Sequence, residues 1–185
     1  MKSPVRLYLV RHGRASAGFA EALDPSLDEV GHAQAKTIAQ ELELLGPLPL
    51  VTSPLKRTRE TAAAFEAQWK VTARVEPRIA EIPSPTEDLQ ARAAWLRQAF
   101  QGRWSDLPQF YQAWRDTVVS FLLSLQTTSV VTTHFVAINA AVGAATGDDR
   151  ILCFEPDHCS CTVLEVVNDC LQVATLGRQR ATQVR

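Results

Sequence analysis

Three apolar, strand-like segments of this sequence each end in polar or basic side chains. These polar ends are residues 11–14, 52–57 and 133–134, which read RHGR, TSPLKR and TH. Arginine binds planar oxyanions through paired hydrogen bonds, and histidine can attack or protonate them. Residue types grouped in this way therefore point to chemistry on a phosphate or a similar anion.

His12 is the candidate nucleophile of this set. Arg11 and Arg14 flank it, and their positive charges repel a protonated imidazole, so we expect the pKa of His12 to be low. A neutral imidazole beside fixed positive charge is suited to attack on phosphorus. A buried histidine that only hydrogen-bonds in the core is the alternative. The recurrence of polar residues at three strand ends favours the catalytic interpretation.

Strand and helix patterns alternate along the first part of the chain. The predicted elements are a strand over 5–10, a helix over 25–46, a strand over 48–54 and a helix over 55–69. Ser26 or Asp28 is the candidate N-cap of the first helix, and Gly46 is its candidate stop. This alternation is typical of a mainly parallel sheet, whose strands end at one common edge. We therefore expect the polar strand ends to meet.

The rest of the chain continues this pattern after an aromatic-rich helical insertion over about 86–125. The aromatic side chains of the insertion are interpreted as core, and a cap over a pocket is the alternative. A strand over 129–134, a helix over 135–147 and a hairpin over 161–177 are predicted to follow. We predict an α/β fold in a single domain over 1–185, with the hairpin as an antiparallel edge.

Composition limits the partners and the location. The 185 residues carry a net charge of −1, with 46% hydrophobic and 21% charged residues, so neither a nucleic-acid nor a membrane surface is indicated. The apolar runs are too short for a membrane span. The spacing of Cys153, Cys159, Cys161 and Cys170 does not match a zinc site, although His158 is near them, and favours reduced thiols in strands. A cytoplasmic protein without a metal or other cofactor is expected.

Several stretches resemble the histidine phosphatase superfamily, which includes phosphoglycerate mutases. LVRHG and TSPLKRTRETA look like its two signature stretches, and DPSLDEVGHAQAKTIAQEL is similar to the segment between them. VVTTHFVAI resembles the segment of the second histidine, and SCTVLEV resembles a late strand of the family. The resemblance implies a phosphoglycerate mutase-like, three-layer sandwich with helices on both faces of the sheet.

The resemblance also implies roles for individual residues. His12 would carry a phosphohistidine intermediate, Arg11 and Arg57 would bind the phosphoryl oxygens, and His134 would complete the pocket. A solvated helix arginine, as assumed for Arg59, is the alternative for Arg57. Substrate-binding positions are expected at four further residues, of which Ser16 is alternatively a plain loop residue. These four residues are Gly13, Arg14, Ser16 and Phe135.

A general acid is expected, because a departing alkoxide needs a proton. In the family this acid is a carboxylate that follows the second helix, and Glu81 is the candidate at that place. Glu87 and Asp88 are its rivals, although they resemble the acidic first turn of the next helix. The sequence departs from the family pattern around the pocket, at Arg14 and at Phe135, so the substrate is open.

The expected function is a metal-independent phosphatase that hydrolyses a phosphomonoester of a small metabolite. Three alternatives are kept: a phosphoglycerate-type mutase, a phosphohistidine-protein phosphatase and an inactive module that binds a phosphorylated ligand. The short chain disfavours the mutase, and Glu81 disfavours the phosphohistidine-protein phosphatase. The physiological substrate and the oligomeric state are not predicted.

Overall fold

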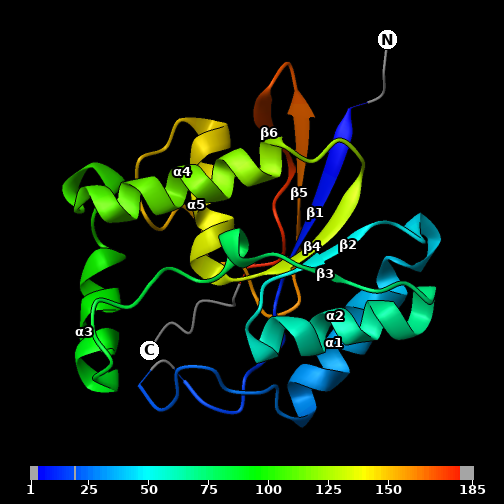
Figure 1. The fold of residues 1–185 in the computed structure, drawn as a ribbon, viewed down its shortest axis with the longest axis horizontal. Helices are drawn as coiled ribbons and strands as arrows, with labels where there is room; N and C mark the ends of the chain where they lie inside the picture. Colours follow the sequence, from blue (N-terminus) through cyan, green and yellow to red (C-terminus); the bar gives the residue numbers. More distant parts are fainter. Residues whose placement is uncertain (1–3, 19, 180–185) are drawn as a thin grey trace.

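The computed structural model describes residues 4–18 and 20–179, and these residues build a six-stranded sheet with helices on both faces (Figure 1). The strands are β1 (Val5–Arg11), β2 (Leu50–Thr52), β3 (Arg74–Val75), β4 (Ser129–Thr133), β5 (Cys161–Val167) and β6 (Cys170–Thr175). The α-helices are α1 (Glu29–Glu41), α2 (Lys56–Trp69), α3 (Leu89–Ala99), α4 (Gln109–Leu123) and α5 (Phe135–Thr146).

The strand order in the sheet is β3-β2-β4-β1-β5-β6. The pairs β3–β2, β2–β4 and β4–β1 are parallel, whereas β5 and β6 join as antiparallel strands. The predicted α/β fold, with a mainly parallel sheet and a hairpin at its antiparallel edge, is therefore confirmed. The sequence patterns did not indicate β3, which is only two residues long and exposed.

The side chains of β1 show how one strand supports both layers of helices. Leu7 and Leu9 pack on the face covered by α4 and α5, while Tyr8 and Val10 pack on the face covered by α1 and α2. Successive side chains of a strand point to opposite faces, so an unbroken apolar run is what a strand between two helical layers requires. Burying a side chain of this size contributes about 1.5–3 kcal/mol.

The helix α1 begins as predicted and ends earlier than predicted. Asp28 is its N-cap, and its carboxylate accepts a hydrogen bond of 2.7 Å from the backbone N–H of Gly31. The α-helix ends at Glu41, and a 3₁₀ turn over Glu43–Leu45 separates it from Gly46. Gly46 therefore ends that turn and not α1. Apolar periodicity alone does not separate a final 3₁₀ turn from an α-helix.

The aromatic-rich insertion contains α3 and α4, joined around a 3₁₀ turn over Trp104–Asp106. Most of its aromatic side chains pack in the interior, and Trp104 and Phe121 are the most buried, at 1% exposure each. Phe110 differs, because it is 63% exposed. Phe100 differs in another way, since it lines the large cavity described below. The core interpretation holds for most of the insertion, and part of the insertion also reaches the cavity.

The four cysteines are all unpaired thiols. Cys161 and Cys170 lie in strands, whereas Cys153 and Cys159 lie in the loop between α5 and β5, so the prediction of strand positions was wrong for these two. Burial raises the pKa of Cys153 to about 11 and that of Cys159 to about 12. Within residues 4–18 and 20–179, no helix has the length and apolar character needed to cross a bilayer.

Candidate active site

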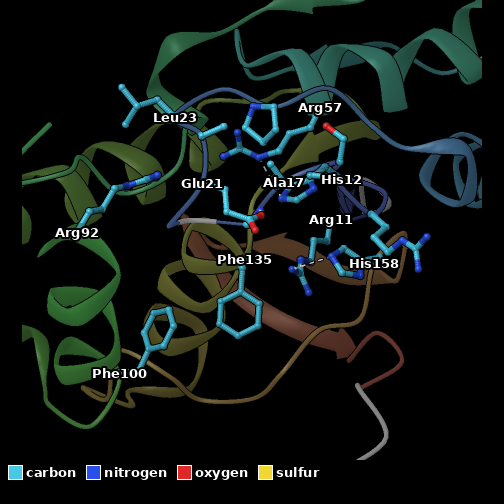
Figure 2. Close-up of a pocket in the computed structure, with 16 residues that line it drawn as sticks. Arg11, His12, Ala17, Glu21, Leu23, Arg57, Arg92, Phe100, Phe135 and His158 are labelled. Atoms are coloured by element: carbon cyan, nitrogen blue, oxygen red, sulfur yellow. Dashed lines mark hydrogen bonds between the residues drawn. The ribbon is translucent and has the colours of Figure 1, made fainter. Parts of the chain in front are cut away.

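The carboxyl ends of β1, β2 and β4 meet at one edge of the sheet, because these strands are mutually parallel. A cavity of about 430 Å³ opens at this edge (Figure 2). Six of the residues singled out in the sequence line it: Arg11, His12, Arg14, Ser16, Arg57 and Phe135. Gly13, Glu81 and His134 are buried and are not among the residues that line it.

The hydrogen bonds of His12 fix which ring nitrogen is free to react. Its Nδ1 lies 2.8 Å from the carbonyl oxygen of Gly13, which can only accept, so Nδ1 carries the proton. In the neutral ring Nε2 then has the lone pair, and it accepts a hydrogen bond of 3.3 Å from Nε of Arg57. The arrangement presents an unprotonated Nε2 next to a guanidinium group.

The surroundings of His12 keep the imidazole neutral. The side chain is 4% exposed, and this burial lowers the pKa of His12 well below its ordinary value. The charges of Arg11 and Arg57 lower the pKa further, whereas the hydrogen bond to Gly13 opposes the shift. The low pKa predicted from the flanking arginines has burial as its largest cause and a contribution from Arg57 of α2, while Arg14 is not among its causes.

Arg11 is held by the loop that precedes β5. Its Nη1 donates to the carbonyl oxygen of Pro156 at 2.8 Å, and its Nη2 lies 3.1 Å from Nε2 of His158. The backbone of Arg11 also pairs with this loop, through Ser160 and Cys159. These contacts fix the guanidinium group at the cavity wall with few free rotamers.

Arg57 reaches the cavity from the first turn of α2 and is 3% exposed. The alternative of a solvated helix arginine is therefore wrong for Arg57, and it is right for Arg59, which is exposed. The Nη1 of Arg57 lies 3.8 Å from a carboxylate oxygen of Asp24. Asp24 was not singled out in the sequence. It stands in a loop without a regular pattern.

His134 is the N-terminal cap residue of α5 and is completely buried. Its Nε2 shares a hydrogen bond of 2.7 Å with the hydroxyl of Ser53, and its ring centre lies 5.4 Å from that of His12. Burial is the largest cause that lowers the pKa of His134 well below its ordinary value; repulsion from His12, if both rings were protonated, and the charges of Arg57 and Arg11 lower it further. A second neutral imidazole thus lies directly behind the candidate nucleophile.

Glu81 is buried beside the same helix end. Its Oε1 accepts hydrogen bonds of 3.1 Å from the backbone N–H groups of Ile82 and Val136, so it caps the first turn of α5. Its Oε2 is buried, with no hydrogen-bond partner among the described residues. Burial raises the pKa of Glu81, while the charge of Arg57 lowers it in part. A proton on Oε2 fits this environment.

The rival acids are placed differently. Asp88 is the N-cap of α3 and accepts a hydrogen bond of 2.9 Å from Ala91. Glu87 is exposed, and neither side chain lines the cavity. Their predicted place in the first turn of the helix was wrong by one or two residues, because α3 begins at Leu89, after both of them.

Gly13 provides space for another part of the backbone. A Cβ atom built on Gly13 would lie 2.5 Å from the carbonyl oxygen of Gly31, and one built on Gly31 would lie 2.1 Å from that of Arg14. Only two glycines let the first turn of α1 approach the loop this closely. Gly13 also donates its N–H to the hydroxyl of Thr61 at 3.1 Å. It therefore positions the ring of His12 through its backbone.

The remaining predicted substrate positions lie in the cavity wall. Arg14 is about half exposed and pairs with Asp28 through an Nε–Oδ2 contact of 2.5 Å. Ser16 is exposed. The ring of Phe135 packs under Arg11, with 5.0 Å between the guanidinium carbon and the ring centre. Phe135 thus helps to hold Arg11 by a cation–π contact.

Several wall residues were missed as site residues from the sequence, among them Arg92, Phe100 and His158. Arg92 of α3 and Phe100 after it point toward the cavity, and His158 approaches it from the opposite side (Figure 2). The sequence showed His158 only as a neighbour of cysteines, and it showed Arg92 only as one arginine of a helix. The one available signal was the aromatic-rich insertion, because a cap over a pocket was the alternative interpretation of its aromatic side chains.

Within the described part of the chain, no group of three or more histidine, cysteine, aspartate or glutamate side chains is arranged to hold a metal ion. His158, considered as a neighbour of a zinc site, instead contacts Arg11. The positive charge at the cavity comes from arginine side chains.

Comparison with known proteins gives several phosphatases and a mutase. The chain is 33% identical to 5''-phosphoribostamycin phosphatase of Niallia circulans over 110 residues, 54% of this chain and 48% of that protein. It is 39% identical to phosphoserine phosphatase 1 of Hydrogenobacter thermophilus over 82 residues, 42% of this chain and 39% of that protein. A probable phosphoglycerate mutase of Photorhabdus laumondii is 33% identical over 82 residues, 42% of this chain and 38% of that protein. The matched region thus spans less than half the length of these curated relatives.

The fold agrees with solved structures of phosphatases. A mycobacterial glucosyl-3-phosphoglycerate phosphatase superposes with a TM-score of 0.73 at 20% identity, covering 96% of this chain and 100% of that chain. The family model of the histidine phosphatase superfamily (branch 1) matches residues 7–179, which include every candidate site residue discussed above. This chain belongs to the histidine phosphatase superfamily.

Proposed function

We propose that this protein is a metal-independent phosphatase that hydrolyses a small phosphomonoester through a phosphohistidine on His12. The observation that carries the proposal is the neutral His12, whose unprotonated Nε2 lies at a cavity wall beside Arg57 and Arg11. Phosphoryl transfer depends mainly on positioning and on charge stabilisation, and this wall supplies both. The phosphatases among the relatives support the same class of reaction.

In the first step Nε2 of His12 attacks phosphorus, and the bond from phosphorus to the ester oxygen breaks. Arg11 and Arg57 neutralise the non-bridging oxygens, and His134 stabilises the charge that develops on them. Glu81, protonated at Oε2, gives its proton to the departing oxygen. The alcohol leaves, and the phosphoryl group stays on His12.

In the second step water attacks the phosphohistidine. The carboxylate of Glu81 takes the proton from that water, the bond from phosphorus to Nε2 breaks, and inorganic phosphate leaves. Glu81 and His12 then regain their starting protonation states, so the cycle closes without a further reactant. Four residues are assigned to binding or to positioning around the substrate: Gly13, Arg14, Ser16 and Phe135.

Three alternatives differ from this proposal in a step that can be tested. A mutase would return the phosphoryl group to a second hydroxyl, and the similarity to a probable phosphoglycerate mutase keeps this reaction as an outcome of the test. A phosphohistidine-protein phosphatase would not need an acid such as Glu81, because the nitrogen of a phosphoramidate leaves readily. An inactive binding module would hold phosphate and form no covalent adduct. The cytoplasmic location and the single domain stay predictions.

The test is to trap the intermediate with a labelled phosphomonoester and an alkaline quench. We expect label in a bond that is stable to base and labile to acid, as in a phosphoramidate. His12→Ala should show no label, while still binding phosphate weakly through Arg11 and Arg57. His134→Ala should form the adduct slowly.

Folded His12→Ala protein that keeps near-normal turnover, or label found on His134, would overturn the mechanism. Transfer of label to an added alcohol in preference to water would identify a mutase. Unchanged activity in EDTA is expected, and activity that EDTA abolishes and a divalent ion restores would refute metal independence.

A further inference from the structure

The cavity extends beyond the phosphate-binding residues, and its outer wall indicates what the phosphate is attached to. Building on the proposed function, we infer that the substrate is the phosphate ester of an apolar alcohol, about the size of a benzyl group, that carries an anionic group. Phe100, Phe135 and Leu23 would contact the apolar part, and Arg92 would bind the anionic group.

The apolar wall is formed by three large side chains from separate segments. Phe135 begins α5, Phe100 follows α3, and Leu23 belongs to the loop before α1. The two phenyl rings lie 5.6 Å apart between their centres. Leu23 is 50% exposed, and an apolar ligand in the cavity would cover it. Ligand pockets are usually apolar surfaces with a few polar groups at fixed places.

The apolar wall starts directly beside the phosphate site. Phe135 lies under the guanidinium group of Arg11, and Phe100 continues the wall away from His12 (Figure 2). An alcohol whose phosphate contacts Arg11 and His12 would therefore place its first carbon atoms against Phe135. A small polar alcohol such as glycerol or serine would leave this wall in contact with water and would gain little from it.

Arg92 adds positive charge on the leaving-group side of the cavity. It is 6% exposed, and its charge acts on both Arg57 and Glu81. Arg14 also lines the cavity, but Asp28 neutralises it. Arg11 and Arg57 adjoin His12 and account for the phosphate. By its position, the guanidinium group of Arg92, which points toward the cavity from α3 (Figure 2), can contact a second anionic group on the same substrate.

Glu21 is the acidic side chain that lines the cavity. Its Oε2 accepts a hydrogen bond of 2.7 Å from the backbone N–H of Gly18, which holds the Glu21 carboxylate against the loop between β1 and α1. Four arginine side chains line the same cavity, so the wall as a whole favours anions. A carboxylate on the substrate, bound in paired hydrogen bonds, matches the guanidinium group of Arg92.

The experiment compares four esters of primary alcohols, so that all leaving groups need similar help from Glu81. These esters are benzyl phosphate, 4-carboxybenzyl phosphate, glycerol 1-phosphate and phosphoserine. We expect kcat/KM to be highest for 4-carboxybenzyl phosphate, with benzyl phosphate second. An aromatic ring or a paired carboxylate should each change kcat/KM by about 10-fold or more.

Two variants separate the two contacts. Phe100→Ala should lower kcat/KM for both benzyl esters by about 10- to 100-fold, and should lower that for glycerol 1-phosphate by a clearly smaller factor. Phe110→Ala is its control, because Phe110 is 63% exposed outside the cavity wall. Arg92→Met should remove the advantage of the carboxybenzyl over the benzyl ester. Arg97→Met, an exposed arginine of the same helix, should keep that advantage.

The ratio of the two benzyl esters cancels any general effect of Arg92 on Arg57 and Glu81. Hydrolysis of glycerol 1-phosphate or phosphoserine as fast as the benzyl esters, or equal losses on all four esters in Phe100→Ala, would overturn the inference and leave the phosphatase proposal intact. Failure to hydrolyse any ester and to form any phosphoenzyme would instead refute the proposed function.

Discussion

Replacing Glu81 by glutamine tests the proposed acid with little change of shape. Glutamine keeps an oxygen at the position of Oε1, so the hydrogen bonds from Ile82 and Val136 that cap α5 can persist. The new amide group takes the place of Oε2, which has no hydrogen-bond partner among the described residues. An unsatisfied buried amide costs about 1–3 kcal/mol of folding stability, so the variant should remain folded.

The loss of activity should depend on the leaving group. For an alkyl phosphate, removal of the general acid should lower kcat/KM by about 10²-fold or more. For nitrophenyl phosphate the loss should stay below about 10-fold, because the phenolate leaves without a proton. Both rates are measured on protein whose folding is verified by thermal denaturation, with Glu87→Gln as the control. Equal losses on the two substrates, or the same pattern in Glu87→Gln, would refute the assignment of Glu81.

Three further outcomes are expected. His158→Ala should raise KM about 10-fold by releasing Arg11, and His158→Gln should restore part of the loss through its acceptor oxygen. Gly31→Ala should cost about 1–3 kcal/mol of stability in urea denaturation, because its Cβ would lie 2.1 Å from a backbone oxygen, whereas Gly18→Ala, with 3.6 Å, should cost less. The pKa values of His12 and His134 are lowered in the folded state, so below about pH 6.5 the unfolded chain binds protons that the folded chain does not. The free energy of unfolding is therefore highest above about pH 6.5 and falls by up to about 1.4 kcal/mol per pH unit for each histidine below it. Urea denaturation against pH in phosphate-free buffer measures this, and a double variant with glutamine at both positions should lose that slope.

The sequence was informative where position in a strand determines position in space. His12, Arg57 and His134 follow parallel strands, so their meeting at one edge of the sheet was predictable. The tautomer of His12 was not, because it depends on a backbone carbonyl whose direction is set by the packing of Gly13 against Gly31. The largest cause of its low pKa was also missed, since burial depends on the whole fold.

The outer part of the cavity was less predictable. Arg92, Phe100 and His158 come from a helix, its end and a loop, and no spacing or periodicity connects them with the strand ends. Their approach depends on how α3 and the loop before β5 pack on the sheet. The two-residue β3 also escaped prediction, because its residues are exposed and show no apolar pattern.

The contacts between Arg11 and the loop before β5 also have a consequence for folding. Arg11 and Pro156 are separated by 145 residues along the chain, and β5 must pair with β1 before they can meet. Contacts between such distant residues form late, because closing a long loop of chain costs entropy before the contact is made. During synthesis, His12 and Arg57 therefore emerge from the ribosome well before Arg11 can be fixed. The geometry needed for phosphoryl transfer is completed only when nearly the whole described chain has been made, so partial chains should be inert toward phosphate esters.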